Sequence, residues 1–107
     1  MNIPIIVLQF LAEIVGTFLF VILILLITSK WTGANKVALP IGLALALCIF
    51  LFGDLTGGHF NPAVSFGFFV KDPKLFTGVM LIIYTIGQVI GGIIAVELHG
   101  HILEKLL

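Results

Sequence analysis

The sequence has little charge and no arginine. Only 9% of its 107 residues are charged, whereas a soluble domain usually carries about 25%. All five cations are lysines, and five acidic residues bring the formal net charge to zero. A chain of this composition cannot cover a water-facing surface, so we expect the lipid bilayer to be its solvent. Without a basic patch, nucleic acid is not expected as a partner.

Cysteine and metal-ligating side chains are also scarce. Cys48 is the single cysteine and lies in an apolar run, which excludes an internal disulfide. His59 has no second ligand at a useful spacing, so we expect no metal site and no cofactor. No nucleophile, base and orienting group can be recognised together, so we expect no catalytic residue and predict that the protein is not an enzyme.

Long hydrophobic runs are what the sequence does contain. Its hydrophobic share is 61% and its mean hydropathy is +1.33. A bilayer core of about 30 Å needs about 20 apolar residues per helix. Three runs approach or exceed that length, at about 5–27, 37–52 and 75–96, and Pro40 is expected in the first turn of the second. We therefore predict an all-α, multi-pass integral membrane protein. The first run is too long for a typical signal peptide, so we expect it to stay as a span.

Residues 53–70 do not fit a full crossing. The first part is rich in glycine and polar residues, and the apolar part from Asn61 has only ten residues. Ten helical residues cover about 15 Å, or half of the bilayer core. Asn61 is a good helix cap, and Pro62 and Ala63 follow it. We predict a re-entrant loop and a half-helix that starts there. A surface loop with an interfacial helix is the alternative, although that helix would lack a basic polar face.

A family resemblance appears in the same segment. Residues 55–67 read Leu-Thr-Gly-Gly-His-Phe-Asn-Pro-Ala-Val-Ser-Phe-Gly and resemble the first pore motif of the major intrinsic proteins, the aquaporins and glycerol facilitators. Residues 12–17 resemble the first-helix signature of that family, and residues 84–92 resemble its third helix. Family members have six spans and two Asn-Pro-Ala half-helices related as inverted repeats. The resemblance covers the whole chain, 1–107, but only the first half of this pattern.

The resemblance implies an architecture and a function. The chain would form one inverted repeat of an aquaporin-like bundle, with three transmembrane helices, one re-entrant loop and one half-helix. It would be a passive channel, or half of one, for water and other small neutral solutes such as glycerol. The positive end of the half-helix dipole would oppose cations and protons in the pore. The residues that would line the pore are Asn61, Gly57, Gly58, His59 and Val64.

Four further residues have expected roles around the loop. Glu13 lies inside the first span, where an ionisable side chain is a functional candidate. Its carboxylate could accept hydrogen bonds from loop N–H groups, and the resemblance supports this scaffold role over a proton relay. Gln88 should serve the same loop from the third span, and Asp54 should cap or hydrogen-bond it. Ile41 falls at the second-helix constriction of the family. Water-selective members commonly have an aromatic residue there and an arginine after the second motif, so selectivity stays open.

One copy of the chain cannot enclose a pore, so we expect a partner. Either a second half-channel or an inverted homodimer would supply the missing wall, and a tetrameric assembly is also considered. With the N-terminus inside, two lysines lie inside and three lie outside. This small bias permits insertion in both orientations. The inner lysines would be Lys71 and Lys74, and the outer ones Lys30, Lys36 and Lys105.

Two other functions stay open at this point. The first is a non-conducting fragment that binds or regulates a full-length relative. The second is a dual-topology small multidrug transporter that uses Glu13, although such transporters need four full crossings.

Overall fold

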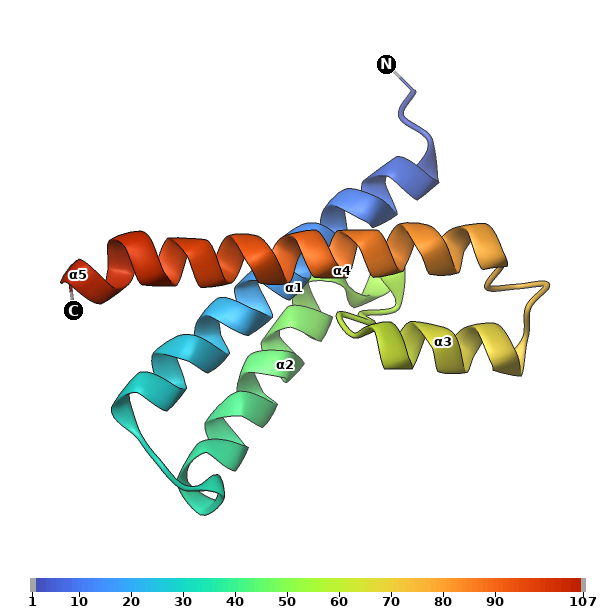
Figure 1. Cartoon of the computed structure of the whole chain (residues 1–107). Coiled ribbons are helices and arrows are strands. Elements are labelled where there is room, and N and C mark those ends of the chain that lie inside the picture. Colours follow the sequence, from blue (N-terminus) through green and yellow to red (C-terminus); the bar gives the residue numbers. More distant parts are fainter. Residues whose placement is uncertain (1, 107) are drawn as a thin grey trace.

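The computed structural model describes residues 2–106, which fold into helices joined by short loops (Figure 1). Three of these helices are long and apolar enough to cross a membrane. No strand occurs within the described residues, so the predicted all-α class is confirmed. The elements in chain order are α1 (Ile5–Lys30), α2 (Ala34–Thr56), α3 (Pro62–Lys71), α4 (Gly78–Leu98), the π-helical segment η1 (His99–Leu103) and the last turn α5 (Glu104–Leu106).

The crossing of α1 and α4 is the closest approach between long helices. A Cβ atom on Gly91 would collide with the carbonyl oxygen of Ile14 and would lie 2.9 Å from the backbone nitrogen of Phe18. A Cβ atom on Gly87 would lie 3.2 Å from the carbonyl oxygen of Phe10. Small residues four positions apart let membrane helices approach in this way. The crossing therefore requires glycine at position 91 and leaves little room for a side chain at position 87.

The start of α2 differs from the sequence prediction. The predicted span covers 37–52, whereas the helix begins at Ala34, where Gly33 precedes it with a φ of 97°. The polar residues before position 37 form the first turn because the N–H groups of Lys36 and Val37 both bond to the Gly33 carbonyl. The sequence predicted Pro40 in the first turn of the helix, but because the helix begins earlier, Pro40 lies in its interior. Proline has no N–H to donate to the preceding turn.

The end of α2 also lies beyond the prediction. Residues 53–56 are helical, although the sequence predicted that the loop starts at position 53. The N–H of Gly57 bonds to the carbonyl of Gly53 at 2.8 Å, and Gly57 adopts the left-handed conformation with a φ of 88°. Glycine in this conformation commonly ends a helix. The loop is therefore short and covers residues 57–61.

The half-helix α3 has ten residues. Asn61 caps its start, because its side-chain oxygen accepts the N–H of Ala63 at 2.9 Å, and Pro62 is the first helical residue. After α3, Asp72 accepts the N–H groups of Lys74 and Leu75, both at 3.2 Å, and turns the chain toward α4.

The start of α4 lies three residues beyond the predicted position 75. The side chain of Thr77 caps the helix by accepting the N–H of Met80 at 3.3 Å. Residues 72–77 therefore belong to the connection between α3 and α4.

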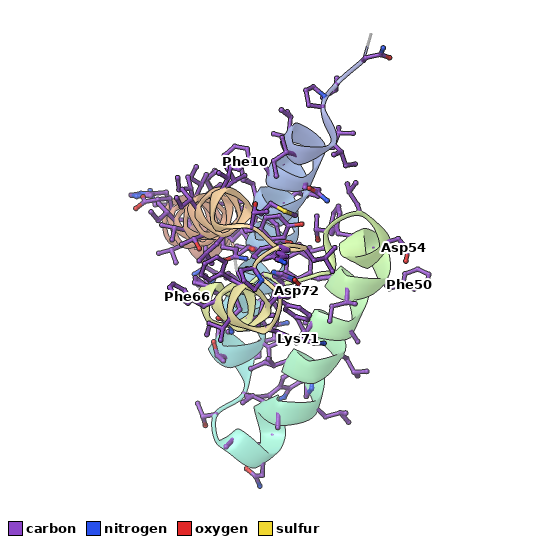
Figure 2. The ribbon with its side chains drawn as sticks, turned by 90° about the vertical axis from the view of Figure 1, so that its right-hand side faces the viewer. Phe10, Phe50, Asp54, Phe66, Lys71 and Asp72 are labelled. Carbon is purple, nitrogen blue, oxygen red and sulfur yellow. The ribbon has the colours of Figure 1, made fainter. Side chains whose placement is uncertain are left out.

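The helices form two arms that spread from the loop. In the described residues α2 packs on α1 and α3 packs on α4, while no Cα atom of α2 lies within 8 Å of a Cα atom of α3. Figure 1 shows α3 lying alongside α4 and α2 alongside α1. A small core of Phe76, Leu81 and Tyr84 lies on α4 and the segment before it. Phe50 on α2 is 83% exposed and points away from the bundle in Figure 2.

Candidate functional site

The loop of residues 57–61 has an unusual backbone. Three of its residues have a positive φ, at 88° for Gly57, 66° for Gly58 and 50° for Phe60. Glycine adopts such angles easily, but a bulky residue such as Phe60 rarely does. Gly58 is also tightly placed, since a Cβ there would lie 3.0 Å from the side chain of Ile49. The surrounding residues must hold this conformation in place.

Phe60 is held at both its backbone and its ring. Its N–H donates to Glu13 Oε1 at 3.0 Å. Its ring lies so close to Gly16 on α1 that a Cβ on this glycine would collide with it. The ring also meets Phe52 edge-on, with centroids 6.3 Å apart. Glycine at position 16 therefore makes room for the strained residue.

Glu13 is the central acceptor beneath the loop. Its side chain is completely buried, and Oε1 accepts both the N–H of Phe60 and the amide Nε2 of Gln88, the latter at 2.8 Å. The structure thus brings together the two residues expected to support the loop. Glu13 accepts from a single loop N–H, and Gln88 makes no hydrogen bond to the loop backbone itself within the described residues.

Ser65 is a member of this network that sequence reasoning missed. It lies on α3 with a fully buried side chain. Its hydroxyl oxygen accepts from Gln88 Nε2 at 2.9 Å and lies 2.8 Å from Nδ1 of His59. The signal that could have identified it is its place as the only hydroxyl in an otherwise apolar half-helix.

The end of α2 is fixed by three further hydrogen bonds that the sequence did not indicate. The hydroxyl of Tyr84 donates to the Thr56 carbonyl at 2.9 Å, and the N–H of Gly58 donates to the Thr56 hydroxyl at 2.9 Å. Gln9 Nε2 donates to the Leu55 carbonyl at 3.1 Å. These bonds tie the entry of the loop to α1 and α4.

His59 lies in an aromatic pocket. Its ring stacks on Phe68 with centroids 4.8 Å apart and planes 13° apart. The rings of Phe76 and Tyr84 lie at 4.9 and 5.0 Å. The residue is only 6% exposed, so its side chain packs inward. Within residues 2–106, no group of three His, Cys, Asp or Glu side chains could hold a metal ion.

The remaining predicted site residues differ in exposure. Gly57, Asn61, Pro62, Ala63 and Val64 are exposed, and Gly58 is buried. Asn61 Nδ2 makes no hydrogen bond within residues 2–106, because the cap uses only the side-chain oxygen.

Two other predicted residues lie apart from the loop. Ile41 is half-buried on α2, about 22 Å of helix from its loop end. Asp54 is exposed on α2 and makes no side-chain hydrogen bond within the described residues, so the expected contact with the loop is wrong.

Comparison with known sequences identifies the family. The sequence model of the major intrinsic protein family matches residues 4–106. The chain belongs to this family. Its fold, with three long helices and a re-entrant half-helix, fits that family, and the family is one of passive channels and not of enzymes. The chain is therefore an integral, multi-pass membrane protein.

Several curated relatives are similar to the chain. It is 41% identical to "Aquaporin-8" of Mus musculus over 82% of the chain and 34% of the relative. It is 39% identical to "Aquaglyceroporin" of Toxoplasma gondii, over 74% of the chain and 30% of the relative. It is 38% identical to "Glycerol uptake facilitator protein-like 6" of Lactiplantibacillus plantarum, over 81% of the chain and 40% of the relative. The chain thus spans about a third of the length of these relatives. No solved structure matches it.

Proposed function

We propose that the chain forms one wall of a passive membrane channel for water and other small neutral solutes such as glycerol. The observation that carries this proposal is the loop of residues 57–61, held in a strained conformation with the exposed Asn61 at the start of a half-length helix. The names of the relatives, which include aquaporins, an aquaglyceroporin and a glycerol uptake facilitator, support the same solutes.

The half-helix would provide the barrier to ions. With about 1.5 Å per residue, α3 is about 15 Å long and reaches half of the bilayer core. Its N-terminal end carries about half a positive elementary charge, which opposes the entry of cations and protons. Lys71 lies in the last turn, where a cation is favoured by the opposite end of the dipole.

Donors and acceptors on the loop would guide the solute. The free amide hydrogens of Asn61 can donate to the oxygen of a water or an alcohol. No donor within residues 2–106 bonds to the carbonyl oxygens of Gly57, Gly58 or His59, so these acceptors are available for solute hydroxyls. Val64 would add an apolar wall, and Ile41 would add an apolar constriction without an arginine. A pore made only of copies of this chain would contain no arginine, so it would not be strictly selective for water.

A partner would complete the pore. The Cα atoms of α2 stay more than 8 Å from those of α3, so a single chain leaves this side open. We propose that a second half-channel or an inverted copy of the chain covers it, with tetrameric assembly as a further level. The lysine distribution, with two on one side and three on the other, permits insertion in both orientations.

Water flow into vesicles tests the proposal. Vesicles that contain only this chain should shrink faster after an osmotic step than empty vesicles, as measured by light scattering. Asn61→Ala should lower that rate, because the donor in the pore is lost. Asn35→Ala is the matched control, since Asn35 is exposed in the first turn of α2. No flow above that of empty vesicles would contradict a channel formed by copies of this chain alone. The chain would then be either one half of a channel that needs a different second half, or a non-conducting fragment that binds a full-length relative.

The multidrug transporter is not proposed further. Three helices within residues 2–106 are long enough to span the membrane, whereas that transporter needs four. Glu13 is already engaged by Phe60 and Gln88, which argues against a free carboxylate that binds a drug or carries protons.

A further inference from the structure

We propose, on the basis of the channel function above, that the side chain of His59 is a second hydrogen-bond donor to the solute. Its Nε2–H group would face the oxygen of a passing water or small alcohol beside Gly57. Ser65 would be the positioning residue that fixes this arrangement, because its hydroxyl bonds to the other ring nitrogen.

The direction of each hydrogen bond follows from a chain of four side chains. An ionised carboxylate can only accept hydrogen bonds, so with Glu13 in this form the amide nitrogen of Gln88 must face Oε1. The second hydrogen of that same nitrogen points to the hydroxyl oxygen of Ser65. The hydroxyl of Ser65 therefore acts as an acceptor on this side and has its own hydrogen left to donate.

That hydrogen has one available acceptor. Within the described residues, the remaining neighbour of the Ser65 hydroxyl is Nδ1 of His59, at 2.8 Å. A ring nitrogen that accepts a hydrogen bond carries no proton, so the proton of a neutral imidazole must be on Nε2. The aromatic pocket favours the neutral ring, because a buried charge without a partner is costly. The network thus selects one tautomer.

The free nitrogen lies at the exposed edge of the loop. A Cβ built on Gly57 would be 3.3 Å from His59 Nε2, so this nitrogen lies beside Gly57, which is exposed. Nε2 makes no hydrogen bond within residues 2–106. It is not one of the fully buried polar atoms without a partner, so part of its surface is accessible. The small exposed part of His59 is consistent with a donor that opens toward the proposed path.

Ring-plane contacts would keep this donor in place. Phe68 stacks on one face of the imidazole, while Phe76 and Tyr84 approach it at inclined angles. Tilting the ring out of its plane would break the stacking, and a half-turn within that plane would break the bond to Ser65. The loop would then present two fixed donors, Nε2–H of His59 and the amide of Asn61, next to carbonyl acceptors. This pattern suits solutes with a hydroxyl group.

The experiment is ¹⁵N NMR of the histidine rings in the chain in lipid bilayers. A variant with His99→Gln and His101→Gln leaves His59 as the single histidine. We expect a proton on Nε2, a hydrogen-bonded and unprotonated Nδ1, and an exchange cross-peak between the Nε2 proton and water. In Ser65→Ala the hydrogen-bonded signal of Nδ1 should be lost, and Ser65→Thr should restore it because threonine keeps the hydroxyl. His59→Phe should lower the water flow about fivefold, the factor that corresponds to one ordinary hydrogen bond.

The outcomes separate this proposal from the channel function. A proton on Nδ1 in the otherwise unchanged chain, or no cross-peak with water, would overturn the donor role of His59. An Nδ1 signal that does not change in Ser65→Ala would overturn the positioning role of Ser65, and normal flow in His59→Phe would overturn the contact with solute. Vesicles without any water flow would instead overturn a channel formed by this chain alone, while the NMR result would still decide the tautomer and the exposure of Nε2.

Discussion

The two sides of the bundle use glycine in opposite ways. At the crossing of α1 and α4, a Cβ on Gly91 would collide with the neighbouring backbone. On the arms, a Cβ on Gly42 of α2 or on Gly67 of α3 would meet no atom within 4 Å. The crossing is therefore a packed interface that requires glycine at position 91. Gly42 and Gly67 therefore lie on open faces of α2 and α3, where a glycine serves no contact within the described residues.

The loop is held mainly from the packed side. Its supporting side chains are Glu13 on α1 and Gln88 and Tyr84 on α4, which are all nearly or fully buried. The open side contributes Thr56 at the end of α2 and Ser65 at the start of α3. Most of the side chains that support the loop thus come from α1 and α4, the two helices of the packed crossing.

Replacing a glycine at the crossing should have the largest effect. We expect Gly91→Leu to destabilise the chain by about 3 kcal/mol or more, because overpacking against backbone atoms cannot be relieved by a rotamer change. Gly92→Leu is the matched control on the next residue, where a Cβ meets nothing within 4 Å. It should be neutral or slightly stabilising, since leucine favours helix over glycine. Unfolding by SDS in mixed micelles measures both, and equal losses would contradict the contrast.

The acceptor beneath the loop should have the next largest effect. Glu13→Gln keeps the shape but weakens two hydrogen bonds, those from Phe60 and Gln88, so we expect a loss of about 1–2 kcal/mol. The amide hydrogen of Phe60 should also exchange faster with deuterium. Glu97→Gln is the control, because Glu97 is exposed and pairs with His101 on the surface. If the Phe60 amide exchanged at the same rate in both variants, Glu13 would not support the loop.

The link between α2 and α4 should have a smaller effect. Tyr84→Phe removes the hydroxyl that donates to the Thr56 carbonyl and leaves the ring in place. Interhelical hydrogen bonds in membranes contribute about 0.6 kcal/mol on average, so we expect a loss of that order. The amides of residues 57 and 58 should become less protected from exchange. Ser29→Ala, which removes an exposed hydroxyl bonded within α1, should leave them unchanged.

Much of the fold follows from the sequence. Hydrophobic length predicts the three long helices, and the ten apolar residues after Asn61 predict the half-helix, because helix rise per residue is constant. The end of α2 was not predictable from composition. Gly53 looks like a helix end in the sequence, but its neighbours stay helical and Gly57 forms the actual cap. Which of several glycines ends a helix depends on tertiary contacts, here the bonds to Thr56 and Leu55.

The candidate site was predictable only in part. Glu13 and Gln88 were identified because polar side chains within apolar spans are conspicuous and because the family resemblance suggested their role. Ser65 was missed because serine is common. The position of a single hydroxyl on a short helix does not show which way the serine side chain faces. The contact of His59 with Ser65 depends on how α3 lies on α4, and the sequence does not specify that packing.

The outer face of α2 should show the smallest effect and gives the sharpest test of the open side. Phe50 is 83% exposed, so Phe50→Ala should change the stability of the solubilised monomer by less than about 0.5 kcal/mol. Phe76→Ala is the matched control, because Phe76 is 8% exposed and its loss should leave a cavity beside Tyr84 and His59. Both are compared by SDS unfolding at a detergent concentration that keeps the chain monomeric. A large loss of stability in Phe50→Ala would mean that the outer face of α2 is already covered in the solubilised protein. The contrast between a packed α1–α4 crossing and an open α2 face would then be wrong.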